Sequence, residues 1–335
     1  MINKINNCEM KQRNTFGISA KCKTLFEYDS IEDLEKIIES IDLKKDKIFN
    51  IGSGSNLLFT KDFDGIMLHS KINDIQIEER TNESVLIKVG AGMIWDDFVA
   101  LTVDNALYGA ENLSLIPGTI GASAVQNIGA YGVEAKDIIE KVYCIDLLTN
   151  KKIVLANKDC QFGYRDSIFK HQKNTFLIVT HVSFRLQING ELKLDYGTIR
   201  QELGDQTPSL SLVRKTIIKI RETKLPDPKK LGSAGSFFKN PIISTAHYEC
   251  LKKQYENIPS YEVENGRKIP AAWLIEQCGW KGKRLSDAGV HPIQPLVLVN
   301  YGNADGKEIV ELAQSIQQDV QTKFNITIEP EAIFI

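Results

Sequence analysis

The sequence predicts an α+β protein, and three observations support this fold class. The chain has 335 residues, 42% of them hydrophobic, which suffices for two or three domains at about 150 residues each. Runs with the two-residue period of strands alternate with a few amphipathic helical patterns. The glycine-rich segment after residues 46–52 continues into strand-like sequence, whereas a dinucleotide-binding turn of the doubly wound type opens a helix.

The N-terminal third predicts a helix, a strand and a loop in succession. Residues 31–41 carry apolar side chains at helical spacing and follow Ser30, a favourable helix cap. Residues 46–52 predict a strand that enters the sequence GSGSN, and residues 56–70 are β-type runs without a capped helix.

The middle third predicts a second α+β layer. One amphipathic helix carries Ile94, Phe98 and Leu101 on a single face. Strand-like runs occupy residues 74–79, 84–92, 137–148, 151–156 and 176–186.

The last third predicts a further domain. A helix at 210–225 is ended by Pro226, and the polar residues 226–236 mark a boundary or hinge. Helices expected at 270–279 and 306–324 flank a strand at 295–300.

Composition argues against several classes of function. A net charge of −2 and a pI near 6.3 give no general electrostatic grip on nucleic acid or acidic membrane. No export signal opens the chain and no segment approaches the ~20 apolar residues that span a bilayer, so we expect a cytosolic protein. The six cysteines and five histidines lack CxxC, HxxxH or mixed spacing, so we expect no metal, no disulfide and mostly buried thiols.

The segment GSGSN is the first candidate for chemistry. Its glycines permit positive φ and close approach of another group, and successive amides of such a turn form a nest for phosphate. It lacks the lysine of a Walker loop, which disfavours nucleotide triphosphate hydrolysis. An ordinary turn is the alternative.

The run IPGTIGASAVQNIGAYG, residues 116–132, is the second candidate. Small residues at this density predict a smooth backbone surface that lies flat against a large planar group, and we expect neither a helix nor a strand from them. The alternative is a glycine-rich connection packed between sheets.

Two further candidates are single side chains. Arg165 in GYRDSIFK offers a planar fork suited to a carboxylate, or else a salt-bridged surface turn. Ser236 in GSAGSFFKNP stands beside two phenylalanines and close to Lys239 and Asn240, or else belongs to a turn that opens a strand. No GxSxG elbow surrounds this serine, so hydrolase chemistry has little support.

The terminal sequence TIEPEAIFI is β-like, and alternation predicts Glu329 and Glu331 on one face. An edge strand that uses charges against aggregation is the alternative.

Together these segments resemble one family. Their order matches the UDP-N-acetylenolpyruvoylglucosamine reductase (MurB) family: GSGSNLLF, IPGTIGASAVQNIGAYGVE, FGYRDSIFK, TKLPDP, GSFFKNP, AAWLIEQCGWKGKRLSDAGVHPIQPLVLVN and the terminal EPE. The likeness spans nearly the whole chain, and GSFFKNP combined with YRDS and AAWLI is specific to it. LDYGTIRQEL, with Tyr196, is similar to the loop of the type I subgroup.

The resemblance implies an FAD-binding fold of the vanillyl-alcohol-oxidase (PCMH) type in two α+β subdomains, plus a third α+β domain. The implied divisions are FAD-binding subdomains at 1–72 with 326–335 and at 73–212, and a substrate-binding domain at 213–325. We expect a monomer that acts on small molecules.

The resemblance also implies a reaction: NADPH-dependent reduction of UDP-N-acetylglucosamine enolpyruvate to UDP-N-acetylmuramate through FAD, in peptidoglycan biosynthesis. Arg165 would bind the substrate carboxylate with help from Glu331, and Ser236 would donate the proton. The implied substrate contacts are Tyr196, Lys224, Asn240 and Gln294. The implied FAD contacts are Gly52, Ser53, Gly54, Ser55, Asn56, Pro117, Gly118, Thr119, Gly121, Ala122, Gln126, Asn127, Gly129, Ala130, Tyr131 and Gly132.

The chain departs from the family pattern at its end. The usual Glu-Val-Arg reads Glu331, Ala332, Ile333, so the contact of that arginine is missing. Ser53 stands where glycine is common, and Ser123-Ala124 replaces a frequent Ala-Pro.

Two other functions stay open. An FAD-dependent oxidase or dehydrogenase of the same fold, acting on an alcohol or hydroxy acid, would consume oxygen and would not need Ser236. A flavin- or nucleotide-binding regulator is disfavoured because Arg165, Ser236 and Glu331 occur together.

Overall fold

The computed structural model describes residues 1–335 apart from the side chain of Gln172, and the chain forms two compact units. The first unit comprises Met1–Cys8, Cys22–Ser53 and Asp64–Arg221. The second comprises Glu9–Lys21, Gly54–Phe63 and Glu222–Ile335. Each unit therefore gathers three separate stretches of the chain.

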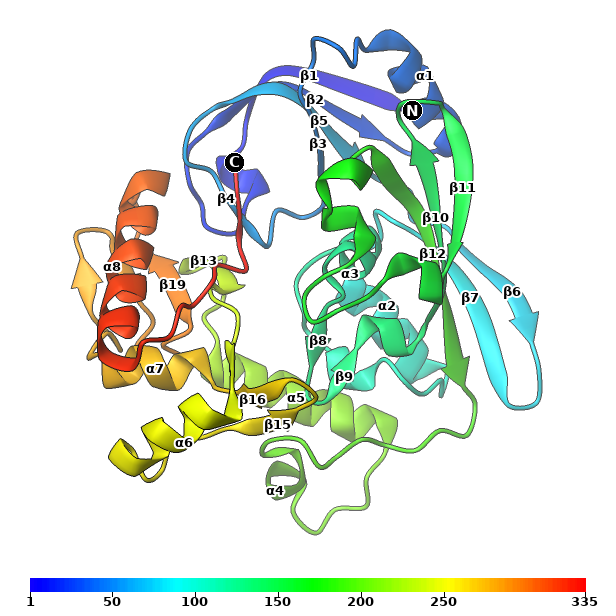
Figure 1. The fold of residues 1–335 in the computed structure, drawn as a ribbon. Coiled ribbons are helices and arrows are strands. Elements are labelled where there is room, and N and C mark those ends of the chain that lie inside the picture. The colour runs from blue at the N-terminus through cyan, green and yellow to red at the C-terminus, as the bar shows by residue number, and fades with distance from the viewer. The chain divides into compact units, whose positions relative to one another are not determined.

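The first unit contains two large sheets and one two-stranded sheet (Figure 1). The smaller sheet pairs, in order, β1 (Ile2–Glu9), β2 (Lys21–Tyr28), β5 (Phe63–Ser70) and β3 (Ile48–Ile51). The larger sheet is antiparallel and pairs β11 (Lys151–Ala156), β10 (Ile139–Asp146), β12 (Leu177–Gln187), β7 (Ser84–Gly90) and β6 (Ile75–Arg80). The strands expected in the middle third are thereby confirmed.

Helix α1 (Ile31–Ser40) covers the smaller sheet. It begins after Ser30, whose hydroxyl accepts a hydrogen bond from the backbone nitrogen of Asp33 at 3.1 Å, as the capping pattern predicts. Leu34 and Ile37 are buried in a cluster with Leu68 of β5.

Helix α2 (Trp95–Asp104) packs on the larger sheet. The ring centroids of Trp95 and Phe98 lie 5.7 and 4.8 Å from that of Phe184 on β12. Burial of each such ring contributes about 1.5–3 kcal/mol, so this aromatic group anchors the helix.

The expectation that residues 116–132 form no regular structure is wrong for part of the run. The structure has helix α3 (Ile120–Gln126) there, followed by the two short strands β8 (Gly129–Ala130) and β9 (Val133–Glu134). Thr119 caps α3, and an added Cβ at Gly121 would lie 3.0 Å from the Cβ of Ala91. The small residues thus let a short helix pack closely on the chain that leaves β7.

Two helices follow β12. Helix α4 (Ile199–Leu203) and helix α5 (Leu210–Lys224) share a small apolar cluster, against which the ring of Tyr131 packs. Helix α5 ends two residues before Pro226, which confirms the predicted stop.

The second unit contains three small sheets. One pairs β13 (Gly232–Ser236), β19 (Val297–Asn300), β18 (Ala288–Val290) and β17 (Arg284–Leu285). Another pairs β14 (Ile242–Ile243), β16 (Gly266–Lys268) and β15 (Tyr261–Val263). The third is the parallel pair of β20 (Ile333–Phe334) with β4 (Leu57–Leu58).

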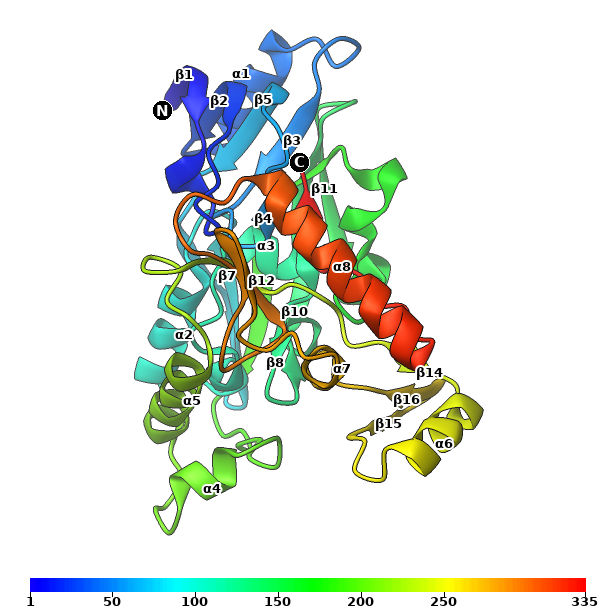
Figure 2. The same ribbon diagram turned by 90° about the vertical axis from the view of Figure 1, so that its left-hand side faces the viewer.

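Three helices complete the second unit: α6 (Thr245–Gln254), α7 (Ala271–Gln277) and α8 (Gly306–Phe324). Figure 2 shows α8 as a long helix near the end of the chain. A capping box begins it, in which Asp305 and Glu308 each accept a bond from the other's backbone nitrogen at 2.9 Å. The helices expected at 270–279 and 306–324 are confirmed.

All six cysteines are free thiols, and four of them are buried. Burial raises the pKa of Cys160 to about 12 and raises that of Cys144 as well. Within the described residues, no cluster of histidine, cysteine or carboxylate side chains has the arrangement of a metal site. Of the helices described here, none is long and apolar enough to cross a membrane.

Candidate cofactor and substrate site

The loop after β3 is packed tightly against two other segments. A Cβ at Gly52 would lie 2.9 Å from the Oγ1 of Thr119. Gly54 has φ +67°, and its Cβ would lie 2.0 Å from the carbonyl oxygen of Arg13. Both positions therefore require glycine for the fold itself.

Ser53, between these glycines, carries an unsatisfied group. Its Oγ is buried and has no hydrogen-bond partner among the described residues. Orphaned buried hydroxyls are rare in native proteins, and a hydroxyl between two glycines of a turn is suited to a phosphate oxygen. This observation fits the diphosphate of a dinucleotide better than it fits an ordinary turn.

Residues 116–132 are fixed by hydrogen bonds from outside the run. Asn127 is fully buried in the left-handed conformation, and its Nδ2 donates to Gly163 O at 2.8 Å and to Glu134 Oε2 at 3.1 Å. Its Oδ1 accepts a bond from the backbone nitrogen of Lys136 at 3.0 Å. Asn127 thus has a structural role that is sufficient to explain its presence.

Arg165 turns towards this run rather than towards its neighbour Asp166. Its Nη2 donates to Gly129 O at 2.6 Å and its Nη1 to Asn127 O at 3.5 Å. A Cβ at Gly129 would lie 3.0 Å from that Nη1, so the glycine makes room for the guanidinium. The Asp166 carboxylate instead lies 3.3 Å from His171 Nε2, which disfavours the salt-bridged turn considered above.

Arg221 is a second cation close to the run, and the sequence reasoning missed it. Its Nε donates to Leu115 O at 3.2 Å. Burial lowers the pKa of Arg221, Tyr131 opposes this effect by a hydrogen bond, and the charge of Arg165 reinforces it. The available signal was its position one turn after Ile217 on the buried face of α5.

Asp96 binds Leu115, the residue that directly precedes the run. Its carboxylate accepts a bidentate pair of bonds from Arg214 at 2.7 and 2.9 Å and a bond from the backbone nitrogen of Leu115 at 2.5 Å. Leu115 has φ +57°, and this strained position is therefore secured from both sides by Asp96 and Arg221.

Ser236 ends strand β13 and pairs with Val297, so it does not belong to a strand-opening turn. The next residue, Phe237, accepts a bond from the backbone nitrogen of Glu331 at 2.7 Å, and Lys239 N donates to Glu329 O at 2.9 Å. We call residues 236–239 with residues 329–331 the serine strip. Main-chain pairing brings Ser236 and Glu331 into neighbouring positions.

The serine strip also contacts the glycine loop. The Nδ2 of Asn56 donates to Glu331 O at 3.1 Å, and Ile333 N donates to Asn56 O at 2.9 Å. In the terminal segment Ile328 and Ala332 are buried, Glu329 is exposed, and Pro330 and Glu331 are half-buried. That both glutamates share a face stays a prediction.

The expected substrate contacts are divided between the units. Tyr196 of the first unit is 47% exposed, and its ring stands edge-on to that of Tyr131 with centroids 6.5 Å apart. Lys224 is exposed at the end of α5 in the second unit. In the same unit Asn240 Oδ1 accepts a bond from Ala271 N at 2.9 Å, and Gln294 N donates to His291 Nδ1 at 3.1 Å.

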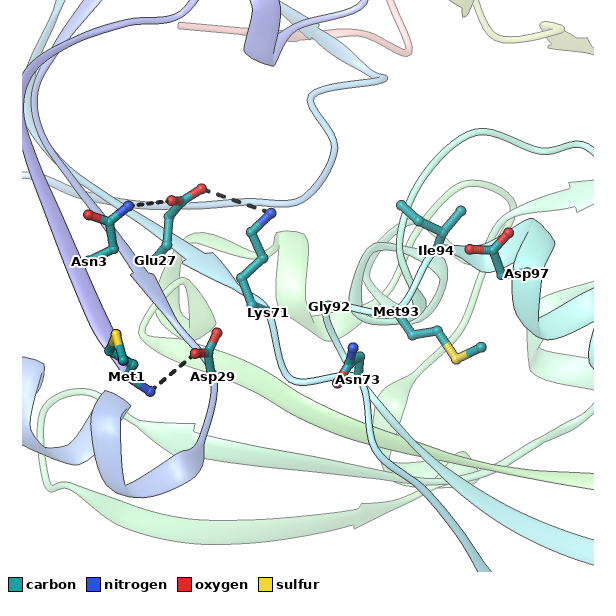
Figure 3. Close-up of a pocket in the computed structure, with 10 residues that line it drawn as sticks. All are labelled: Met1, Asn3, Glu27, Asp29, Lys71, Asn73, Gly92, Met93, Ile94 and Asp97. Carbon is teal, nitrogen blue, oxygen red and sulfur yellow. Dashed lines mark hydrogen bonds and ion pairs between the residues drawn. The ribbon is translucent and has the colours of Figure 1, made fainter.

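A pocket of about 720 Å³ in the first unit contains none of the expected site residues (Figure 3). Three of its polar side chains contact one another: Glu27 accepts from Asn3 at 2.8 Å and lies 3.9 Å from Lys71. Ile94 on its wall forms a bridge with Thr119, so the pocket adjoins the glycine-rich run. Two of its charged groups, Glu27 and Lys71, are thus already paired with one another.

Two parts of the chain match described families. Residues 23–150 match the family "FAD binding domain", and residues 227–335 match "UDP-N-acetylenolpyruvoylglucosamine reductase, C-terminal domain". Ser53, whose buried hydroxyl has no partner, and the glycines on either side of it lie within residues 23–150, and these residues fit FAD.

The chain is similar over nearly its whole length to curated relatives. The UDP-N-acetylenolpyruvoylglucosamine reductase of Bacteroides fragilis is 49% identical over 325 residues, which cover 96% of this chain and 97% of the relative. That of Porphyromonas gingivalis is 45% identical over 329 residues, which cover 97% of each.

A solved structure shows the same fold. The crystal structure of UDP-N-acetylenolpyruvylglucosamine reductase (MurB) from Thermus caldophilus superposes with a TM-score of 0.70 at 21% identity, covering 100% of this chain and 98% of that one. The FAD-binding α+β fold expected from the sequence is thereby confirmed. The chain belongs to the UDP-N-acetylenolpyruvoylglucosamine reductase family and is an FAD-dependent oxidoreductase.

Proposed function

We propose that the protein reduces UDP-N-acetylglucosamine enolpyruvate to UDP-N-acetylmuramate with NADPH, in the synthesis of peptidoglycan precursors. The observation that carries this proposal is the serine strip, in which Glu331 bonds to Phe237, the residue after Ser236, and to the glycine-loop residue Asn56. The names of the full-length relatives supply the substrate.

The substrate is an enol ether that carries a carboxylate. The reaction adds a hydride to its terminal alkene carbon and a proton to the adjacent carbon, and bound FAD supplies the hydride transfer from NADPH. Negative charge develops on the adjacent carbon and on the carboxylate, so this part of the substrate needs a cation and a proton donor.

Arg165 is the proposed partner of the carboxylate. Its guanidinium donates to two main-chain carbonyls, Gly129 O and Asn127 O, which hold the planar fork in place. Arg221 adds a second positive charge in the same region of the first unit.

Ser236 is the proposed proton donor and Glu331 its assistant. A serine hydroxyl is a weak acid, and it serves here because the carbanion is strongly basic and the closed site excludes water. Of the two terminal glutamates, Glu331 bonds through its main chain to Phe237, the residue next to Ser236, whereas Glu329 is exposed and bonds to Lys239, three residues from Ser236. We therefore assign the role to Glu331.

The remaining candidates divide by ligand. Ser53 and the main chain of the glycine loop would hold the FAD diphosphate. Lys224 offers a compact cation to the diphosphate of the sugar nucleotide, with Tyr196, Asn240 and Gln294 as further contacts. The proposal keeps the division into FAD-binding subdomains at 1–72 with 326–335 and at 73–212, and a substrate-binding domain at 213–325. It also keeps a cytosolic location.

The half-reactions test the function directly. The purified protein should be yellow, NADPH should bleach it without oxygen, and the enolpyruvyl sugar nucleotide should restore the colour. Oxygen consumption with an alcohol or a hydroxy acid, together with no recolouring by the sugar nucleotide, would show an oxidase or dehydrogenase instead.

A further inference from the structure

Asn112 is a buried polar residue that none of the proposed roles uses. Its side chain is 1% exposed, and its Nδ2 donates to two main-chain carbonyls, Tyr131 O at 2.9 Å and Lys193 O at 2.8 Å. One amide nitrogen therefore ties residue 131, in the glycine-rich run, to residue 193, in the segment that carries Tyr196.

The cost of this arrangement shows that the two bonds matter. The Oδ1 of Asn112 is buried without a partner in the described part of the chain. An apolar side chain would fill the same space without leaving an acceptor unsatisfied. The donor group is thus what distinguishes asparagine from a filler at this position.

Both residues that Asn112 joins, Tyr131 and Lys193, belong to segments that surround Tyr196. The ring of Tyr131 stands edge-on to that of Tyr196, and a Cβ at Gly132 would lie 3.4 Å from the Cβ of Tyr196. After Lys193 the chain buries Leu194 and Ile199, with the exposed Tyr196 between them. The segment from 193 to 199 is therefore held by the burial of Leu194 and Ile199 and by Asn112, which ties its first residue to the run by hydrogen bonds.

We infer that Asn112 is a positioning residue, which sets Tyr196 against the Tyr131 turn so that Tyr196 can close over the sugar nucleotide. The inference rests on the proposed function, because Tyr196 is a substrate contact there. Asn112 acts through Tyr196, so its loss should affect the sugar nucleotide and spare NADPH and FAD.

The chain offers a matched control. The Nδ2 of Asn157 also bridges two carbonyls, Lys136 O at 2.8 Å and Ile139 O at 2.7 Å, within the same unit. Asn112→Leu and Asn157→Leu each remove one pair of hydrogen bonds from a side-chain amide to two main-chain carbonyls. Asn112→Asp keeps the shape of the side chain but places an acceptor against two carbonyls.

Steady-state kinetics of the FAD-loaded variants test the role. Loss of the tie should raise KM for the sugar nucleotide about tenfold in both Asn112 variants. The KM for NADPH and the FAD content should stay unchanged, and Asn157→Leu should change only the melting temperature. An Asn112→Leu variant that melts earlier with an unchanged KM would overturn the inference, and so would an Asn112→Asp variant with wild-type KM.

Hydrogen exchange separates this inference from the proposed function. Amides of residues 193–198 should exchange about tenfold faster in Asn112→Leu than in Asn157→Leu, whatever the substrate is. Unchanged exchange would overturn the inference. Faster exchange in a protein whose wild type fails to react with the sugar nucleotide would keep the positioning role and refute the proposed function.

Discussion

The glycine-rich run and the serine strip differ in how they are built. In the run, residues 116–132 present main chain, and neighbouring side chains such as Arg165 and Arg221 donate hydrogen bonds to its carbonyls or to those next to it. In the serine strip, main-chain pairing forms the frame, and the side chains of Ser236 and Glu331 are the groups to which we assign the proton transfer. Under the proposed function, the backbone shape of the run holds the cofactor, whereas a few side chains of the strip carry the reaction.

The largest expected effect follows from removal of the Ser236 hydroxyl in the serine strip. We expect Ser236→Ala to slow recolouring by the sugar nucleotide by about 10²- to 10⁴-fold, because a positioned proton donor contributes that much. Bleaching by NADPH should keep its rate. Anaerobic stopped-flow absorbance measures both steps.

Ser233→Ala, three residues earlier in β13, is the control for this substitution. Normal recolouring of Ser236→Ala would remove the serine from the proton-donor role.

Arg165 combines features of both regions, because main-chain carbonyls of the run orient a side chain to which we assign a role in the reaction. Arg165→Lys loses the planar fork and should slow turnover by about 10²-fold, in line with the loss of one preorganised donor to developing charge. The measurement is kcat with saturating NADPH and sugar nucleotide.

Arg185→Lys is the matched control, since that guanidinium pairs with Glu140 on the larger sheet. Equal turnover of Arg165→Lys and the wild type would mean that no fork is needed at residue 165.

The glycine loop should break through backbone geometry. Gly54→Ala combines a left-handed φ of +67° with a Cβ placed 2.0 Å from Arg13 O. Strain of this kind costs about 1–3 kcal/mol before the clash is counted, so the free energy of unfolding and the FAD content should both fall. Urea titration and the flavin absorbance of the purified protein measure these losses.

Gly204→Ala isolates the conformational part, because Gly204 has φ +58° and nothing within 4 Å of its Cβ. If both variants lost the same stability, tight packing at Gly54 would contribute nothing.

The smallest expected effect concerns the frame around the run and depends on pH. Burial alone would raise the pKa of Asp96, but the hydrogen bonds from Arg214 and Leu115 N outweigh burial and hold this pKa below its usual range. A depressed pKa stabilises the fold above the unfolded-state value of about 3.9, and this contribution disappears as pH falls through the folded-state pKa. Wild type should exceed Asp96→Asn by about 1–2 kcal/mol in the free energy of unfolding at pH 7.

Urea titrations at pH 7 and pH 3.5 should show this difference shrink in acid. Asp97→Asn, at the exposed neighbouring position, is the control. A difference that stayed constant with pH would mean that the Asp96 charge is not what matters.

The predictable parts of the fold were those with strong local signals. Ser30 and its apolar repeat gave α1, the proline after α5 gave its end, and alternation gave the strands of the larger sheet. Strand β1 was not predicted, because its sequence INKINNCE has few apolar residues and lies mostly exposed. Helix α3 was predicted wrongly, because its stability comes from close packing on Ala91, which no local pattern records.

The site follows the same division. The sequence singled out Arg165, Ser236 and Glu331, and main-chain pairing of distant segments brings the last two together in the second unit. Arg221 and Asn112 escaped notice because single polar residues on apolar elements resemble surface positions until their partners are known.

A crystal structure of the FAD-loaded protein tests the central claim most directly. The account predicts that the FAD diphosphate lies on the main-chain amides of Gly52–Asn56, with Ser53 Oγ as a hydrogen-bond partner, and that the isoalloxazine ring lies along residues 116–132. A flavin whose diphosphate lies away from Ser53, or whose ring avoids that run, would contradict it.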